Sequence, residues 1–424
     1  MTGTELAPRC RLINRTTLMI HTSRVEHFIE LMVCIAIYRT NHGVKTLLLA
    51  VLWFGAITAQ AVTLAAMGMT TIGGADNGTG LTTIFYPTSS TPTEVKRGPF
   101  TMQLAIDGKA IPGNHRLVVF SHGSGGSPWP MTDLALRFVT AGYAVAMPEH
   151  RGDNYRDHHL QGPASWKLRP LETSQTIDAV QSDSRFKPFI DFDHVGVYGT
   201  SAGGLTALVL AGGKWSPANF QRYCLAQMAE DFPACVGLMT RLKGNWGDAF
   251  KLLVVGWAYR LWFDDETMFA HVDARIKAVL ASVPVAAPFD VATLAQPKIA
   301  VGLVAAGRDQ WLKPRAHVLA VLAACARCKL VLNLPQAGHG SLMSPWPPAL
   351  TSSLTPLLVD PPEFDRADLP EHYQKTVDFF TASLGLQQGK AWRRSPLTLQ
   401  HRPTRQRLNN CATARRCSSA TGSR

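Results

Sequence analysis

The chain has 424 residues, of which 46% are hydrophobic, and a formal net charge of +12 at pH 7. That length allows one large domain or two ordinary ones. The positive charge lies at the ends. Residues 1–45 hold six Arg or Lys and three acidic residues, and residues 379–424 hold nine Arg or Lys and no acidic residue. Residues 46–378 hold 27 basic and 27 acidic residues. Because the middle of the chain is neutral, we expect no nucleic-acid partner.

Residues 44–61 have the composition of an export signal. Lys45 is followed by an apolar run and by an A-x-A cleavage pattern that ends at Ala61. We therefore expect a periplasmic or secreted protein, with residues 1–43 lying upstream of the native start. The alternative is a genuine extension with a membrane anchor at 46–69. Its Thr and Gly content and the cleavage pattern favour removal, so no stable membrane anchor is expected.

Between the two ends, residues 62–388 alternate short apolar runs with amphipathic ones, which predicts an α/β domain. The expected strands are residues 80–86 (at a sheet edge), 116–120, 143–147, 195–198, 278–283, 299–306 and 329–334, and the expected helices are 131–141, 171–180, 202–211, 317–326 and 372–384. Residues 88–98 have the composition of a loop. The predicted fold is a mainly parallel, doubly wound sheet, because continuous apolar runs are typical of parallel strands covered on both faces.

Two further stretches depart from this alternation. Residues 213–270 are rich in Trp and Phe, with helical spacing in parts, and indicate an inserted helical cap. Residues 389–424 consist mostly of Arg, Ser, Thr, Asn and Gln without periodicity. Such a composition predicts a disordered basic tail, or a reading-frame artefact.

A Gly-x-Ser-x-Gly sequence, Gly199 to Gly203, connects a predicted strand to a predicted helix. A chain that passes from strand to helix at one residue strains the backbone there, and side chains two positions to either side would collide, so both positions need glycine. The turn raises the Ser201 hydroxyl above the sheet and directs the Ala202 N–H to the same place. We predict that Ser201 is a nucleophile; the alternative is an ordinary glycine-rich turn.

A serine hydroxyl needs a base to remove its proton, and the base needs a carboxylate to orient it. Asp309 and His339 each follow a predicted strand, at the carboxyl ends where such sheets place their sites. We predict that His339 is the base and Asp309 its partner, with Asp290 and Asp360 as weaker alternatives to Asp309. A turn-capping role for His339, and a helix cap or ion pair for Asp309, are the structural alternatives.

The oxyanion that forms during acyl transfer needs two N–H donors. Ala202 is expected to supply one. The loop that follows the strand at 116–120 is expected to supply the other, and its sequence His122-Gly123-Ser124 lets the backbone approach closely. We nominate the N–H of Ser124. A phosphate-binding glycine loop is not supported, because the G-K-[ST] pattern is missing.

Five segments together resemble the α/β-hydrolases. They are Ser-His-Gly-Ser-Gly-Gly at 121–126, Pro-Glu-His-Arg-Gly-Asp-Asn at 148–154, Gly-Thr-Ser-Ala-Gly-Gly at 199–204, Gly-Arg-Asp at 307–309 and Ala-Gly-His at 337–339. The set is similar to the bacterial predicted dienelactone hydrolase and platelet-activating-factor acetylhydrolase group and covers roughly residues 80–385. Dienelactone hydrolases proper have Cys where this chain has Ser201, so lactone hydrolysis is not implied. In this resemblance His150 and Asp153 shape a loop.

The resemblance implies a serine hydrolase that cleaves small carboxylic esters, with short to medium acyl chains, through an acyl-enzyme. It implies no metal and no organic cofactor. One alternative is a peptidase or amidase with the same residues, and another is an inactive hydrolase fold used as a binding module. The sequence does not predict an oligomeric state.

The remaining expectations concern cysteines and the substrate pocket. In an exported protein, Cys224 with Cys235 and Cys325 with Cys328 are expected to form two disulfides. A zinc site is the rival for Cys325 and Cys328, but no second pair with ligand spacing follows. For the pocket, we expect Trp257 and Trp262 of the cap and His122 of the loop to line it. The alternative is that Trp246, Trp257 and Trp262 only pack the cap against the sheet.

Overall fold

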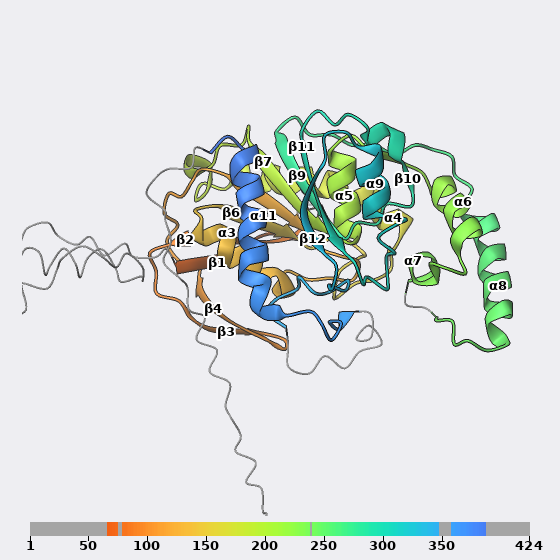
Figure 1. Cartoon of the computed structure of the whole chain (residues 1–424). Coiled ribbons are helices and arrows are strands. Elements are labelled where there is room, and N and C mark those ends of the chain that lie inside the picture. Colours follow the sequence, from red (N-terminus) through yellow and green to blue (C-terminus); the bar gives the residue numbers. More distant parts are fainter. Residues whose placement is uncertain (1–65, 75–78, 238–239, 347–357, 387–424) are drawn as a thin grey trace, which may run out of the picture. The chain divides into compact units, whose positions relative to one another are not determined.

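The computed structural model describes residues 66–74, 79–237, 240–346 and 358–386. The predicted export signal, the upstream residues 1–43 and the basic tail lie outside the described residues. The N-terminal end of the described part is a strand, and its C-terminal end follows a helix (Figure 1).

Ten strands of the described chain form one sheet, in the order β12-β11-β9-β7-β5-β6-β2-β1-β4-β3. They are β1 Ala66–Gly74, β2 Thr79–Thr88, β3 Thr93–Arg97, β4 Phe100–Ile106, β5 Leu117–Ser121, β6 Ala144–Pro148, β7 Val195–Thr200, β9 Ile276–Ser282, β11 Ala300–Ala306 and β12 Lys329–Leu334. From β12 to β6 all neighbours pair in parallel, whereas β2 joins β6 antiparallel. The mainly parallel sheet that the sequence predicts is confirmed.

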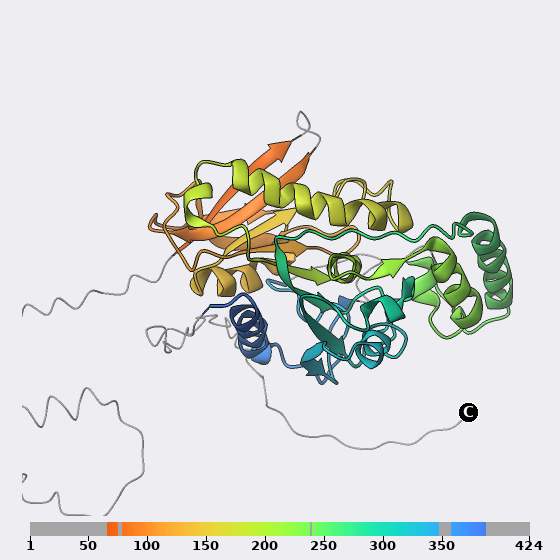
Figure 2. The same cartoon turned by 90° about the horizontal axis from the view of Figure 1, so that it is seen from above.

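Helices cover both faces of this sheet. The principal ones are α3 Thr132–Thr140, α4 Pro163–Ser182, α5 Ala202–Leu210, α9 Val318–Ala324 and α11 Leu369–Ser383. Successive strand residues point to opposite faces. Val197 therefore packs in one apolar cluster with α4 and α5, whereas Tyr198 packs in a second cluster with α3 and α11. Figure 2 shows α4 and α11 on opposite sides of the sheet.

Two expectations about the N-terminal strands are wrong. The strand at 80–86 is not at an edge, because β2 pairs with both β1 and β6. Residues 88–98 are not all loop, since β3 pairs antiparallel with β4. The side chains of β3 are mostly exposed, so this edge strand has no apolar face that its sequence would show. Neither β1 nor β4 was predicted.

The expected helical insertion at 213–270 contains three helices and one short strand: β8 Lys214–Trp215, α6 Pro217–Gln227, α7 Phe232–Val236 and α8 Gly247–Trp262. The strand β8 pairs with β10 (Phe289–Asp290) in a separate two-stranded sheet. The three helices lie together at the right-hand edge of Figure 1. Of the residues of α8, only Gly256 and Tyr259 are buried.

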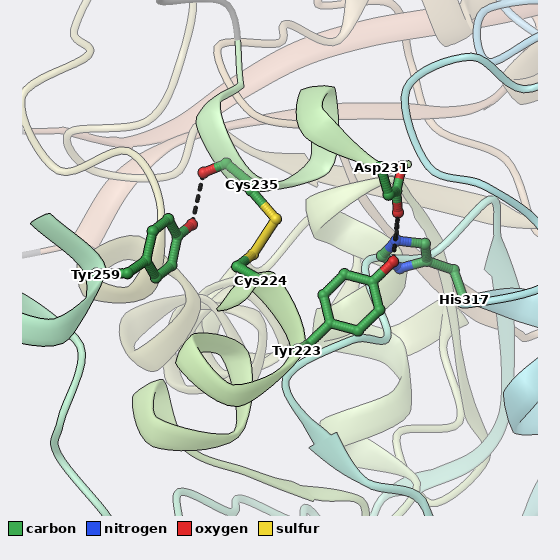
Figure 3. Close-up of a disulfide and its surroundings, with 6 residues drawn as sticks. All are labelled: Tyr223, Cys224, Asp231, Cys235, Tyr259 and His317. Atoms are coloured by element: carbon green, nitrogen blue, oxygen red, sulfur yellow. Dashed lines mark hydrogen bonds and ion pairs between the residues drawn. A yellow bond between two sulfur atoms is a disulfide. The ribbon is translucent and has the colours of Figure 1, made fainter. Parts of the chain in front are cut away.

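Both predicted disulfides are present, Cys224–Cys235 and Cys325–Cys328. The first joins α6 to α7, and the Tyr259 hydroxyl donates a 2.5 Å hydrogen bond to the Cys235 carbonyl (Figure 3). Beside it, the buried Asp231 carboxylate lies 3.1 Å from His317 Nε2. These contacts join the helices of the insertion to one another and connect the insertion to His317, just before α9.

We expect the Cys224–Cys235 bridge to stabilise the fold without serving catalysis. The two cysteines are 11 residues apart, and the chain-entropy model assigns a loop of that length about 3 kcal/mol. The double variant Cys224→Ser/Cys235→Ser should melt at a lower temperature with unchanged kcat and KM at 25 °C. The matched control is Cys325→Ser/Cys328→Ser, whose separation of 3 residues predicts a loss of about 1.5 kcal/mol. Activity that disappears at temperatures where the chain is still folded would contradict this expectation.

No helix among the described residues combines the length and apolar character needed to cross a membrane.

Candidate active site

Ser201 stands at the turn between β7 and α5, as the sequence predicts. Its backbone has φ 57° and ψ −117°, a region that L-residues avoid unless their surroundings enforce it. Here they do: the Ser201 N–H donates to the Ser282 carbonyl at 3.0 Å, and the Ser201 carbonyl accepts from the Val285 N–H at 3.1 Å. The neighbouring strand β9 and the residues just after it therefore fix the strained turn.

The two flanking glycines are required by close backbone contacts. A Cβ on Gly199 would lie 1.9 Å from the Gly203 carbonyl oxygen, and a Cβ on Gly203 would lie 1.8 Å from the Ser121 carbonyl oxygen. Real Cβ atoms do not approach backbone oxygens this closely, and the backbone cannot move aside cheaply. The expected collision on both sides of Ser201 is confirmed.

We expect Gly203→Ala to be among the most destabilising single changes in the chain. The added methyl group would have to displace the end of β5 or the start of α5, so the free energy of unfolding should fall by more than about 3 kcal/mol. The control is Gly256→Ala on α8, where the nearest atom to the added Cβ is an Arg260 side-chain nitrogen at 3.5 Å. Helix propensity predicts a gain of up to about 1 kcal/mol there. Equal stabilities of the two variants in denaturant unfolding would contradict the steric argument.

Asp309 and His339 form a buried pair. Asp309 follows β11, His339 follows β12, and His339 Nδ1 lies 2.7 Å from Asp309 Oδ2. The other carboxylate oxygen accepts the N–H groups of Trp311 and Leu312 at 2.8 and 2.9 Å. With Nδ1 donating to the carboxylate, Nε2 carries the free lone pair that a base needs.

The two rival carboxylates are engaged elsewhere. Asp290 accepts from the Ala292 N–H, and Asp360 pairs with Arg366 at 2.6 Å. Of the three candidates, Asp309 is thus the one that contacts His339. Within the described chain no hydrogen bond joins the Ser201 hydroxyl to His339, a contact that often tightens only when substrate is bound.

Ser201 and His339 line one cavity of about 180 Å³. His122 and Ser124 also line it. Most of the remaining wall is apolar, and is made by Phe100, Pro130, Met131, Trp311, Met343, Trp346 and Leu358. The cavity is therefore an apolar recess with a few polar groups gathered around Ser201, the usual composition of a small-molecule site.

The expectation that Trp257 and Trp262 line the substrate pocket is wrong. Neither belongs to the cavity wall beside Ser201, and the two are 61% and 71% exposed. Both lie on α8, whose buried face is formed by Gly256 and Tyr259, so the Trp side chains point away from the rest of the insertion. α8 is apolar on its packed side and also on its outer side, which no described part of the chain covers.

The loop after β5 lies directly against Ser201. A Cβ on Gly123 would be 3.3 Å from the Ser201 Cβ, so glycine permits the close approach that we expected. Next to it, the Ser124 hydroxyl and the Gly125 N–H both donate to Asp153 Oδ1, at 2.6 and 2.8 Å. Asp153 therefore contacts the loop after β5 directly. The Ser124 N–H has no hydrogen-bond acceptor within the described residues.

Behind this loop is a buried polar network that the sequence did not predict. Arg169 of α4 is fully buried, and its NH2 group donates to Asp153 Oδ2 at 2.8 Å. Next to that pair, His150 Nε2 contacts Ser121 Oγ at 2.8 Å, and His150 Nδ1 contacts Glu172 Oε2 at 2.7 Å. Because the expected helix began at residue 171, after Pro170, Arg169 fell outside it.

The network depends on the charges of its members. Burial opposes ionisation of the Asp153 carboxyl, but Arg169 and the hydrogen bonds from Ser124 and Gly125 hold its pKa at about 2. Burial, together with His150 and Arg169, lowers the pKa of His122 well below its usual value. Burial and Arg169 likewise lower the pKa of His150, against the opposing effect of Glu172. Asp153 is thus ionised and both histidines are neutral at neutral pH.

These pKa shifts predict acid sensitivity between pH 7 and 5. The pKa values of His122 and His150 are lower in the folded chain than the value of about 6.5 in the unfolded chain. The unfolded chain therefore binds protons that the folded chain does not, and stability present above pH 6.5 is lost as the pH falls. Each histidine should contribute up to about 1.4 kcal/mol per pH unit to the slope.

Denaturant unfolding at several pH values between 5 and 8 measures this slope. His150→Gln should reduce it, whereas His194→Gln, at a histidine whose side chain is 46% exposed, should leave it unchanged. A free energy of unfolding that stays constant over the range, or an equal effect of the two variants, would show that the buried histidines do not control acid stability.

Residues 130–221, which include Ser201, match the model of the Prolyl oligopeptidase family. Among solved structures, the ferulic acid esterase from Streptomyces cinnamoneus is similar, with a TM-score of 0.51 and 14% identity over 79% of this chain and 94% of that chain. No curated protein matches the chain. The sheet, the strand–Ser–helix turn and these matches show that the chain has the fold of the α/β-hydrolase class.

Within that class, the comparisons support a serine hydrolase. They do not distinguish a peptidase from an esterase. The narrower resemblance to the dienelactone hydrolase and platelet-activating-factor acetylhydrolase group is not confirmed by these two matches, and stays a prediction.

Proposed function

We propose that the protein hydrolyses carboxylic esters with short to medium acyl chains, through an acyl-enzyme on Ser201. His339 Nε2 takes the Ser201 proton while Ser201 Oγ bonds to the carbonyl carbon, and the carbonyl oxygen becomes an oxyanion held by the N–H groups of Ser124 and Ala202. The carbon–oxygen bond to the alcohol then breaks, and the alcohol leaves with the proton from His339. Water repeats the sequence on the acyl-enzyme and releases the acid. None of these steps calls for a metal or an organic cofactor.

The observation that carries this proposal is the cavity itself. It brings Ser201 together with a histidine whose other nitrogen is held by a buried carboxylate. Its volume of about 180 Å³ and its apolar wall fit one acyl group better than an extended peptide, whose backbone needs polar partners along its length. An inactive binding module would have no need for the strained Ser201 backbone, which costs of order 1–3 kcal/mol.

A peptidase or amidase is the second candidate, because residues 130–221 match a peptidase family. The same chemical groups serve both reactions, and the difference is whether a poorer leaving group can be expelled.

A panel of chromogenic acyl esters of rising chain length, beside amides of the same acyl groups, tests the proposal. We expect esters of short to medium acyl chains to be cleaved with the highest kcat/KM, and the matching amides much more slowly. Faster cleavage of the amides would favour the peptidase, and hydrolysis of neither, with no labelling of Ser201 by a fluorophosphonate, would contradict both.

For the location of the protein, we propose export to an oxidising compartment. The support is the pair of disulfides, since disulfides persist mainly outside the reducing cytosol. Mass spectrometry of the exported protein should find a mature chain that begins at Val62.

A further inference from the structure

We infer that the buried Arg169–Asp153 pair positions the oxyanion loop, residues 122–125, so that the Ser124 N–H faces the reacting oxygen. The inference rests on the proposed function and extends it to two residues that do not touch the substrate. Both side chains are fully buried behind the loop, and neither lines the cavity beside Ser201. They are therefore positioning residues.

Arg169 binds the side of the loop that faces the protein interior. Its NH1 group donates to the His122 carbonyl at 2.6 Å, and its NH2 group lies 3.4 Å from the Gly123 carbonyl. The Gly123 carbonyl also accepts from His122 Nδ1 at 2.7 Å and from the Gly126 N–H at 3.0 Å. Both carbonyl groups are thus turned toward buried donors.

This orientation determines where the next N–H groups point. In a planar trans peptide the C=O and the N–H point in opposite directions. Turning the Gly123 carbonyl toward Arg169 and His122 therefore turns the Ser124 N–H away from the interior. On its other side the loop meets Ser201 and the cavity. The Ser124 N–H, without an acceptor in the described chain, is left free for an oxyanion.

Asp153 completes the arrangement. Its Oδ2 neutralises Arg169, and its Oδ1 accepts the Ser124 hydroxyl and the Gly125 N–H. One carboxylate thus joins the guanidinium to the loop. A buried ion pair seldom improves stability over a well-packed apolar pair, so its value here is the fixed geometry of the N–H groups.

The main test compares Arg169→Lys with Thr176→Val in the full chain. Lysine keeps the charge but loses the planar fork that reaches Asp153 and both carbonyls. A displacement of about 1 Å in a catalytic group costs up to about 100-fold in rate. We expect kcat for an ester to fall about 10- to 100-fold with KM within about twofold, because the oxyanion exists only after bond formation. Thr176 is also buried on α4, where its hydroxyl bonds to the Glu172 carbonyl. Thr176→Val should lower the free energy of unfolding and leave kcat unaltered.

A second measurement is the rate at which an alkyl fluorophosphonate labels Ser201. In that reaction Ser201 Oγ bonds to phosphorus, the phosphorus–fluorine bond breaks, and the proton passes to His339 while fluoride leaves. The phosphoryl oxygen occupies the oxyanion position, so Arg169→Lys should slow labelling by a factor similar to the fall in kcat. The labelling rate tests whether Arg169 positions the oxyanion loop even if the parent cleaves none of the esters tried.

The outcomes separate this inference from the proposed function. A folded Arg169→Lys variant with the parent's kcat and labelling rate overturns the inference and leaves the esterase proposal intact. An equal fall in kcat and labelling rate in Thr176→Val also overturns the inference and leaves the esterase proposal intact. If Arg169→Lys does not fold, the deciding variant is Ser124→Ala, which removes the side-chain hydrogen bond to Asp153 but keeps the Ser124 N–H. Its kcat should fall about fivefold or more at constant KM. An unchanged kcat overturns the inference.

Discussion

Ser201→Ala should lower kcat for ester hydrolysis by up to about 10⁶-fold, to the small rate that the oxyanion donors and substrate binding alone support. The reason is that alanine has no hydroxyl to form the acyl-enzyme. The fold should not change, because the Ser201 side chain has no hydrogen-bond partner within the described residues, and alanine keeps the Cβ that the turn at φ 57° already accommodates. The melting temperature should therefore match that of the parent. Activity against chromogenic esters and thermal unfolding check both statements.

The control is Ser174→Ala on α4, where the hydroxyl contacts His271 and lies outside the cavity. It should keep the parent's activity. A fluorophosphonate should label Ser201 in the parent and in this control, and should label nothing in Ser201→Ala. If label is found on another serine, or if Ser201→Ala remains active, Ser201 is not the nucleophile.

The second large effect is expected from Asp309→Asn. One carboxylate oxygen accepts two backbone N–H groups, from Trp311 and Leu312, and the other accepts His339 Nδ1–H. The two N–H groups oblige an asparagine to keep its oxygen on their side, so its NH₂ group faces His339. Nδ1 must then accept, the proton moves to Nε2, and His339 no longer takes the proton of Ser201. We expect kcat to fall by about 10⁴-fold with little change in the melting temperature.

Asp290→Asn is the matched control, because Asp290 is a rival candidate that caps a short helix far from His339 in the sequence. It should hydrolyse esters at the parent's rate. A large loss of activity in Asp290→Asn, with Asp309→Asn still active, would reverse the assignment.

How much of this site the sequence predicts depends on whether its signal is local. The Ser201 turn is a local feature: strand, two glycines and helix lie within a few residues, and steric exclusion makes the glycines necessary. Asp309 and His339 are far apart in the chain, but each follows a strand, and parallel strands end at one edge of a sheet. Topology brings them together without any knowledge of side-chain packing.

The parts that were missed depend on packing. Arg169 is one basic residue in a helix, and nothing nearby in the sequence shows that Asp153 neutralises it. For Trp257 and Trp262 the sequence suggested a role in the pocket, but neither residue lines the cavity beside Ser201. An aromatic stripe shows that a helix has an apolar face, but periodicity does not say whether another part of the protein covers that face.

The parallel pairing of β7 with β9 has a consequence for synthesis of the chain. β7 lies between β5, which precedes it, and β9, which begins at Ile276 after the helical insertion. Until the ribosome has added β9, one edge of an apolar central strand has no neighbour, and such edges recruit other chains. The strained Ser201 backbone also lacks its bonds to Ser282 and Val285 during that interval. The nascent chain therefore exposes this apolar edge between the completion of β7 and the arrival of β9, and the Ser201 turn cannot become native before Ser282 and Val285 have been added.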